Sequence, residues 1–575
     1  MTFRVCKHIS GKFAQNCFFP LLYIGVSEAK TPIVCGTLTT ISTSFGVVHK
    51  PMGVSTGRFV PAPLGRCERA LCWIVWLFHS AAAFFIAANV SQGKLRPWIG
   101  HWLSNSSYVT GMKVDLSDTE WLHFRNTISH MLLDYALHSV MFFLIIRHVS
   151  TKWVKLALFA AGLLLQIHMT SPTCVIVLIV FATAVTGLSL LTRNIAVPWI
   201  LCISFVLKAS DIVPFTMTNH TYYREFNIYL YGAIKILNFS LYMCKNKEKK
   251  YAEVWEDHLV YLSYLPYSMT LIVLFDDFII QLQRRLPHKE DCGSFVDLRS
   301  AAFFGVRLLL WYFVFEFILH FIYVHSLFNS PFTMVQHLGN YEKCAVAYVI
   351  GQLFHVKYVV LFGVPAFFAR IDGMQPPPPP ICISRVSRYS RMWRHFDAGL
   401  YQFLKNQVYI PLLKVEIPTA LVIIRNLCTL AAVFGVVLAW HGTRSHYVCW
   451  VLLSATELIM ERIGKLIWDT TSFQELRKSI GELNTRRAIA VAMISTVIPG
   501  IFGVFFFLGS EGTGSIILEH ILLDGMKDVL KGNVFPNNSG FVFLHMIALG
   551  YFFNNVCLEF EQAAKPKKDE DTKQE

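Results

Sequence analysis

Long apolar runs alternate with short polar segments along most of this chain, and the pattern predicts helices that cross a membrane. About twelve runs could cross a bilayer when short or tilted crossings are allowed. We therefore expect an all-α polytopic membrane protein with about 11 to 13 hydrophobic helices. The predicted crossings are 70–89, 130–147, 153–170, 173–192, 195–210, 226–245, 301–325, 344–369, 418–440, 446–466, 487–509 and 539–558.

Two further apolar stretches do not look like full crossings. Pro266 breaks the run at 255–281, and Asp276 and Asp277 close it, which favours a re-entrant hairpin. The stretch at 398–413 is too short to span comfortably and predicts an in-plane or re-entrant helix. Non-helical backbone is tolerated at membrane depth only where protein or a water-filled cavity surrounds it, so the hairpin predicts an internal space.

Composition agrees with a membrane protein, since 54% of the 575 residues are hydrophobic, only 15% are charged and the mean hydropathy is +0.47. A net charge of +14 could indicate nucleic acid. Its distribution instead follows the positive-inside pattern, because basic clusters alternate with loops that hold the Asn-x-Ser/Thr sequences at Asn105, Asn219 and Asn537. The alternation holds only if 255–281 does not cross. The alternation places both chain termini in the cytosol. Because the positive charge is explained by membrane topology, we expect no nucleic-acid partner.

The polar ends of the chain lie outside the predicted membrane region, 66–562. Residues 1–65 form a predicted cytosolic extension without the short apolar core of a removable signal peptide. Residues 563–575 are strongly charged and predict a disordered tail.

Asp397 and His441 are the ionisable residues that most suggest chemistry, because such groups are costly near membrane depth and chains that keep them usually use them. The charge pattern places Asp397 in a cytosol-facing stretch and His441 at the lumenal end of 418–440. A reaction that uses both residues would require a central catalytic tunnel.

The segment between 370 and 394 is polar and basic. Residues 376–380 are five consecutive prolines, which favour an extended segment and cannot form helix. The arginines that follow could hold phosphates such as those of coenzyme A, but on spacing alone a positive-inside loop at anionic lipid head groups is preferred. These arginines recur at three-residue intervals: Arg385, Arg388, Arg391 and Arg394.

Several motifs together resemble the hedgehog acyltransferases, which are protein-cysteine N-palmitoyltransferases of the membrane-bound O-acyltransferase superfamily. The motifs are residues 356–366 (VKYVVLFGVPA), 370–373 (RIDG), 392–397 (MWRHFD) and Trp440-His441-Gly442, with weaker similarity at 115–121 (DLSDTEW) and 276–283. Thr443 stands where the family commonly has a second Gly, and Leu412-Leu413 replace its small residues, so substrate range is less certain than reaction class.

The resemblance implies that the domain at 66–562 is an acyltransferase with re-entrant segments around a central tunnel. It would transfer palmitate from palmitoyl-CoA to the α-amine of an N-terminal cysteine on a secreted hedgehog-type protein, in the membrane of the endoplasmic reticulum, with the Golgi as the alternative. The chemistry is reasonable, because a thioester is an activated donor and an α-amine with a pKa of about 7.7 to 8 is partly unprotonated near neutrality.

The resemblance also implies residue roles. His441 would be the catalytic base, although a histidine at a helix end is by itself more often structural. Asp397 would be its catalytic partner, with an ion pair to Arg394 as the plainer interpretation. Trp393 and Arg394 would bind palmitoyl-CoA, and both also suit an aromatic belt and a snorkelling cation.

Cys382 has three interpretations. It could carry a palmitoyl anchor, it could be an idle small residue, or, by family resemblance, its thiolate could ligate a structural haem. At the level of the whole chain, the rivals are a multi-pass transporter using buried carboxylates and a catalytically silent protein that binds lipids or lipoproteins. The transporter candidates are Asp134, Asp211, Glu316 and Glu457.

Overall fold

A computed structural model describes residues 61–218, 220–286 and 298–563. The predicted extension, apart from its last five residues, and the predicted tail, apart from its first, therefore lie outside the described residues. So do Asn219 and the loop at 287–297. Within the described ranges, helices account for almost all regular structure.

The all-α membrane architecture is confirmed, but eight of the helices among the described residues, and not twelve, are long and apolar enough to cross a bilayer. The eight candidate spans are Arg66–Lys94, Thr119–His148, Pro172–Thr192, Leu298–Leu319, Asn340–Ile371, Thr419–His441, Thr471–Leu508 and Ser539–Glu561.

The remaining predicted crossings exist as helices that fall short in length or apolarity. α5 (Val154–Met169) and α7 (Ala196–Ile212) have 16 and 17 residues, which gives roughly 24 to 26 Å against a hydrocarbon core of about 30 Å. α8 (Thr221–Lys245) carries Lys235 near its centre. α19 (Ser445–Trp468) is charged through its second half.

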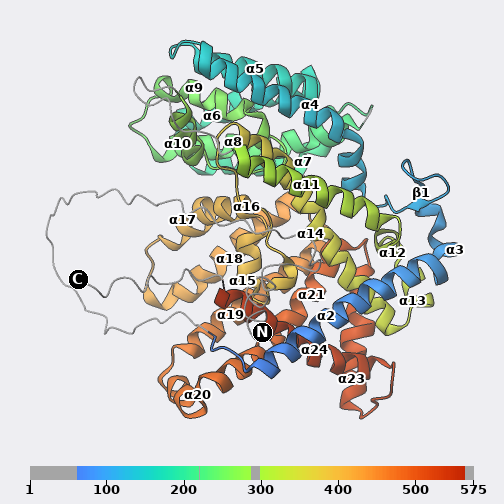
Figure 1. Cartoon of the computed structure of the whole chain (residues 1–575). Coiled ribbons are helices and arrows are strands. Elements are labelled where there is room, and N and C mark those ends of the chain that lie inside the picture. The colour runs from blue at the N-terminus through green and yellow to red at the C-terminus, as the bar shows by residue number, and fades with distance from the viewer. Residues whose placement is uncertain (1–60, 219, 287–297, 564–575) are drawn as a thin grey trace, which may run out of the picture.

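The long helices form two groups on either side of a central one (Figure 1). One group contains α4 to α11 and the other contains α2 and α19 to α24. α14 packs against α11 and α4 on one side and against α2 on the other, with most of its residues buried. Other long helices are α2 (Arg66–Asn89), α4 (Thr119–His148), α6 (Pro172–Thr192), α11 (Leu298–Leu319), α14 (Asn340–Ile371), α18 (Val422–His441), α20 (Thr471–Ala492), α21 (Ile494–Leu508) and α24 (Ser539–Ala563).

Short elements gather at one side of the molecule, the right of Figure 1. β1 (Ser104–Asn105) pairs antiparallel with β2 (Lys113–Val114), and Asn105 lies opposite Lys113. At the start of α14, the Asn340 side chain donates to the Asn537 carbonyl at 3.4 Å. The other short helices of this side are α3 (Arg96–Ile99), α12 (Val324–Phe328), α13 (Pro331–His337), α22 (Thr513–Ile517) and α23 (Asp524–Leu530).

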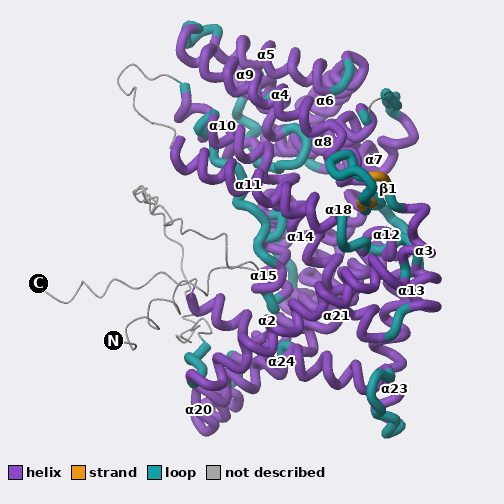
Figure 2. Tube along the Cα trace, turned by 45° about the vertical axis from the view of Figure 1, so that its right-hand side comes forward, coloured by secondary structure: helices purple, strands orange, loops and turns teal. Residues whose placement is uncertain are grey.

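The run at 255–281 has the predicted hairpin shape. α9 (Tyr251–Ser263) is capped by Tyr264, and a single 3₁₀ turn that contains Pro266 follows. Buried non-helical backbone then leads into α10 (Phe275–Arg285). α9 and α10 pack against each other (Figure 2). Which membrane face both ends reach stays a prediction.

The segment after α14 follows the sequence prediction closely. The prolines at 376–380 are non-helical, and α15 (Tyr389–His395) follows them. The stretch 398–413 is a single helical path made of α16 (Ala398–Phe403), a π-helical part (Leu404–Tyr409) and α17 (Ile410–Leu413). Its in-plane position relative to a membrane stays a prediction.

Candidate active site

Asp397 is the N-cap of α16. Its Oδ1 accepts a hydrogen bond from the Leu400 backbone N–H at 2.9 Å, which satisfies one of the free donors at a helix start. Loss of solvation raises the pKa of Asp397 to about 6, although backbone N–H groups of Leu400 and Gly399 act in the opposite direction. The side chain is therefore fixed in direction by its helix and poised to change protonation state in mildly acid conditions.

Gly399 allows the first turn of α16 to lie directly against the hairpin. A Cβ atom at this position would meet the Ile272 carbonyl oxygen at 2.4 Å, well inside van der Waals contact. The Ile272 backbone belongs to the buried non-helical part of the hairpin. The position of Asp397 thus depends on the hairpin at 255–281.

His441 is the last residue of α18, and the next residue stops the helix. Gly442 adopts φ 106° and ψ 163°, a region that residues with a Cβ rarely enter, while its N–H still bonds the Leu438 carbonyl at 2.8 Å. The Trp440-His441-Gly442 motif is thus a helix terminus that presents the imidazole at the point where the backbone turns away.

Aromatic rings surround His441. Its imidazole meets the edges of Trp450 at 5.2 Å and Phe507 at 5.1 Å between ring centroids, both nearly perpendicular. Trp450 in turn lies 5.7 Å from Trp393, with 21° between the ring planes. One indole therefore separates the predicted base from the predicted donor-site tryptophan.

A second series of ring contacts, near the middle of α14, connects Phe507 beside His441 with Phe396 beside Asp397. Phe507 packs against Phe354 at 5.6 Å, and Phe354 stacks on Phe396 at 5.4 Å with 4° between the planes. Phe396 immediately precedes Asp397. Asp397 and His441 thus approach a common region from different elements, and their joint role in catalysis stays a prediction.

Tyr231 of α8 closes this region from a third side. Its ring meets Trp440 edge-on at 5.0 Å, and Asp397 is within electrostatic range of its hydroxyl. Both Asp397 and His441 are surrounded by protein, yet each retains some accessible surface. Such a combination is expected of groups that face an internal space.

Arg394 is exposed and does not form the ion pair with Asp397 that helix spacing permits: within the described ranges its guanidinium lies 5.8 Å from the Tyr401 ring centroid instead. Two of its neighbours are neutralised by Glu561 of α24, which contacts Arg388 at 2.6 Å and Arg391 at 3.5 Å. Arg388 and Arg391 thus have a carboxylate partner within the chain, whereas Arg394 has none among the described residues.

A buried charge cluster lies next to the same region, and sequence reasoning assigned it no role. Lys357 of α14 contacts Asp118 at 2.8 Å and Glu120 at 2.9 Å, and the Tyr358 hydroxyl donates to Glu120 at 3.0 Å. Burial would raise the pKa of Asp118, but the Lys357 ammonium outweighs it and lowers that pKa to about 2. The sequence feature that could have indicated this cluster is Lys357, a lysine inside an apolar run.

Cys382 lies in the segment between the prolines and α15, with 8% of its surface exposed. Just before it, the Ile381 N–H donates to the His395 carbonyl at 3.0 Å, which ties the segment to the end of α15. The structure places the Cys382 sulfur in a disulfide bond, so it offers iron no free thiolate and these residues do not fit the predicted haem ligation.

Similar proteins share the motifs described above. The chain is 27% identical over 354 residues to protein-cysteine N-palmitoyltransferase Rasp of Drosophila melanogaster, covering 60% of this chain and 67% of the fly protein. It is 32% identical over 221 residues to protein-cysteine N-palmitoyltransferase HHAT of Mus musculus, covering 38% and 43%. The mouse HHAT-like protein is 25% identical over 262 residues, covering 45% and 49%.

These matches confirm the resemblance to protein-cysteine N-palmitoyltransferases, although they span less than half of either mouse protein. The family model described as "MBOAT, membrane-bound O-acyltransferase family" matches residues 217–504, which is half of the chain. This half includes the hairpin, α14, Asp397 and His441. The acyltransferase class that the sequence indicated is thus confirmed, and the chain belongs to the membrane-bound O-acyltransferase family.

Proposed function

We propose that this protein transfers a palmitoyl group from palmitoyl-CoA to the amine of an N-terminal cysteine on a secreted hedgehog-type protein, forming an amide. The convergence of Asp397 and His441 on one enclosed region carries the proposal. Similarity to proteins named protein-cysteine N-palmitoyltransferases supports the choice of acyl group and acceptor.

In this proposal His441 takes the proton that the attacking α-amine loses as the tetrahedral intermediate forms and collapses. A histidine in this role typically contributes on the order of 100-fold to 10,000-fold. The imidazole can act this way because Gly442 ends α18 immediately after it. The coenzyme A thiolate leaves as the new amide bond is completed.

Asp397 is assigned to positioning and electrostatic support of the reacting groups. The carboxylate is held by the N-terminus of α16, and the Tyr231 ring packs against Trp440 of the Trp440-His441 turn at 5.0 Å between ring centroids. On the donor side, Trp393 would line the path of the acyl chain and Arg394 would pair with a phosphate of coenzyme A. Arg394 suits this role because it is exposed and no carboxylate of the described chain neutralises it.

The decisive experiment is acyl transfer by detergent-purified protein from labelled palmitoyl-CoA to a peptide that begins with cysteine. Product that resists hydroxylamine is an amide, whereas a thioester would be cleaved. An otherwise identical peptide with an acetylated N-terminus should give no stable product, because its α-amine is blocked. Transfer to the acetylated peptide, or binding of donor without turnover, would contradict the proposal.

We place the reaction in the membrane of the endoplasmic reticulum, with the acceptor on the lumenal side. Asn105 and the Asn537 contact lie toward the start of α14, and Arg370 lies at its other end. The positive-inside pattern assigns the end with the glycosylation sequences to the lumen and the end with Arg370 to the cytosol. Protease protection of epitope-tagged protein in microsomes tests this orientation and the cytosolic position of the termini.

The transporter alternative is less well supported, because two of its candidate carboxylates have structural partners. Glu316 accepts from the Trp121 indole at 2.9 Å and pairs with Arg125 at 3.0 Å. Asp134 contacts His168 at 2.6 Å. Groups held in such pairs stabilise helix packing and are poorly placed to bind a transported ion.

A further inference from the structure

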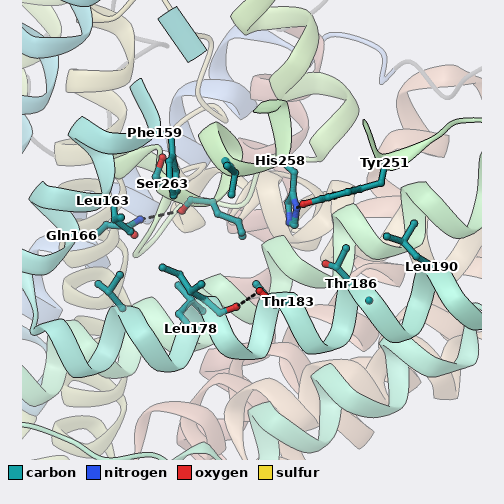
Figure 3. Close-up of a pocket in the computed structure, with 16 residues that line it drawn as sticks. Phe159, Leu163, Gln166, Leu178, Thr183, Thr186, Leu190, Tyr251, His258 and Ser263 are labelled. Carbon is teal, nitrogen blue, oxygen red and sulfur yellow. Dashed lines mark hydrogen bonds between the residues drawn. The ribbon is translucent and has the colours of Figure 1, made fainter. Parts of the chain in front are cut away.

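A cavity of about 200 Å³ lies between α5, α6 and α9 (Figure 3). Two of its lining residues, Ile179 and Thr183, are exposed on the outer surface of α6, so the cavity opens sideways. α6 is a candidate membrane span, so this opening faces the hydrocarbon of the bilayer. Access from a membrane would be lateral.

The cavity is long and narrow. Its lining follows α6 from Val175 to Leu190, a distance of about 22 Å at 1.5 Å per residue. One leaflet provides roughly half of a 30 Å hydrocarbon core, so the cavity could accommodate an extended lipid chain. A small volume spread over four helical turns suits one flexible chain better than a rigid fused-ring lipid.

Polar side chains line both ends of the cavity, but only one end has polar atoms in need of a partner. Figure 3 shows Tyr251, His258 and Thr186 near Leu190, whereas Gln166 and Ser263 lie with Phe159 and Leu163 toward the other end. There the Gln166 amide already donates to the Leu262 carbonyl at 3.0 Å and the Ser263 hydroxyl to the Val260 carbonyl at 3.4 Å. None of the described lining residues is Asp, Glu, Lys or Arg. The lining thus favours a neutral ligand with a polar head and an apolar tail.

Two of these polar groups are buried without a hydrogen-bond partner among the described residues. They are Thr186 Oγ1 and His258 Nε2, on residues that are 4% and 3% exposed. The His258 ring is held by stacking on Phe239 at 3.6 Å, and its Nδ1 contacts the Tyr251 hydroxyl at 3.4 Å. Because buried polar atoms without partners are costly, a ligand that supplies hydrogen bonds is expected here.

We propose that this cavity binds a neutral, single-chain lipid whose hydroxyl-bearing head contacts Thr186 and His258. A hydroxyl group can accept from one of these side chains and donate to the other, so it satisfies both atoms, which a plain hydrocarbon cannot. The head would lie near the end of α6 and the start of α9, next to the basic residues 245–250, where a membrane interface is expected.

The test uses a monoacylglycerol analogue with a photoreactive diazirine in its chain and an alkyne for detection, added to the full-length protein in neutral lipid vesicles. Cross-links should map to α5, α6 and α9. Thr183→Trp fills the opening and should reduce labelling by about tenfold or more, which corresponds to about 1.4 kcal/mol or more of binding free energy. Leu188→Trp, on the exposed side of α6 outside the cavity, is the matched control and should label normally.

Thr186→Val removes one orphaned hydroxyl without changing side-chain shape and should weaken labelling roughly three- to tenfold. Thr192→Val is its control, because the Thr192 hydroxyl is already bonded to the Leu188 carbonyl. Thermal unfolding of each variant checks folding. Equal labelling of Thr186→Val and wild type would overturn the proposed head contact.

Competition distinguishes the ligand classes. Unlabelled monoacylglycerol should displace the probe, and palmitate anion and a sterol should do so at least about tenfold less well. Displacement mainly by the sterol would overturn the single-chain assignment. Cross-links confined to other helices would overturn the site itself. None of these readouts depends on acyl transfer, so they stand apart from the proposed function.

Discussion

Trp393 and Trp450 stack with 5.7 Å between their ring centroids and 21° between their planes. The edge of the Trp450 indole is also what His441 contacts. The first tryptophan belongs to α15, beside Asp397, and the second to α19, beyond the turn that follows His441. The stack therefore fixes the spacing between the donor-side segment and the predicted base.

The first prediction concerns His441. His441→Ala should lower acyl transfer on the order of 100-fold to 10,000-fold, because no other group would accept the proton of the amine. Thermal unfolding should change little, since the side chain is only half-buried. His520→Ala, at an exposed position paired only with Asp524, serves as the control and should retain full activity. Near-normal transfer by His441→Ala would refute the base assignment.

The second prediction is a pH dependence carried by Asp397. A carboxyl with its pKa raised to about 6 is charged above that pH and neutral below it. If transfer requires the carboxylate, kcat should fall with one acid limb as pH drops through about 6. Asp397→Asn should be slower and should lack this limb. An unchanged acid limb in Asp397→Asn would assign the titration to another group.

The third prediction tests the contact between α16 and the hairpin. Gly399→Ala should reduce both stability and transfer, because its Cβ would meet the Ile272 backbone at 2.4 Å and neither backbone can move freely. Gly435→Ala, in the middle of α18, has open space around the new methyl group and should be neutral or slightly stabilising. Thermal unfolding and acyl transfer of both variants give the comparison, and equal behaviour would argue against the contact.

The fourth prediction concerns the buried cluster around Lys357. Lys357→Met should destabilise the protein by about 3 to 5 kcal/mol, because the Asp118 and Glu120 carboxylates would lose the ammonium group that they share. Lys208→Met breaks an exposed pair with Asp211 and should cost less than about 1 kcal/mol. Denaturation midpoints in one detergent measure the difference. A small effect at Lys357 would mean that water reaches the cluster.

The fifth prediction separates Arg394 from its neighbours. Arg394→Gln should raise KM for palmitoyl-CoA by roughly tenfold and leave KM for the peptide unchanged, because one charge-assisted phosphate contact is lost. Arg394→Lys should recover part of the affinity, since the charge remains without the planar guanidinium. Lys405→Gln, in the helical path that follows Asp397, controls for general loss of positive charge. A shift in peptide KM instead would place Arg394 on the acceptor side.

Local pattern predicted a large part of this molecule. The apolar runs marked the helices, Pro266 marked the hairpin, and the prolines before Cys382 marked an extended segment. The motifs around Asp397 and His441 indicated the acyltransferase family. These features are encoded within a few consecutive residues, so a single sequence is enough to show them.

What the sequence did not predict depends on partners far along the chain. Four of the predicted crossings are not among the eight long apolar helices of the described residues, because α5 and α7 are short, Lys235 lies within α8 and α19 is charged in its second half. The Trp393–Trp450 stack joins residues from two elements, and the Lys357 cluster joins α14 to the start of α4. Spacing along one helix cannot reveal which distant side chain neutralises a charge.

Glu561 illustrates how such a partner couples distant parts of the protein. By holding Arg388 and Arg391, the last helix of the described chain acts as a latch on the segment that carries Trp393 and Asp397. Release of α24 would leave two guanidinium groups without their carboxylate, directly before the donor-side residues. Among the described residues, ion pairs thus join the end of α24 to the segment before Trp393, and this pairing sets how much positive charge that segment presents.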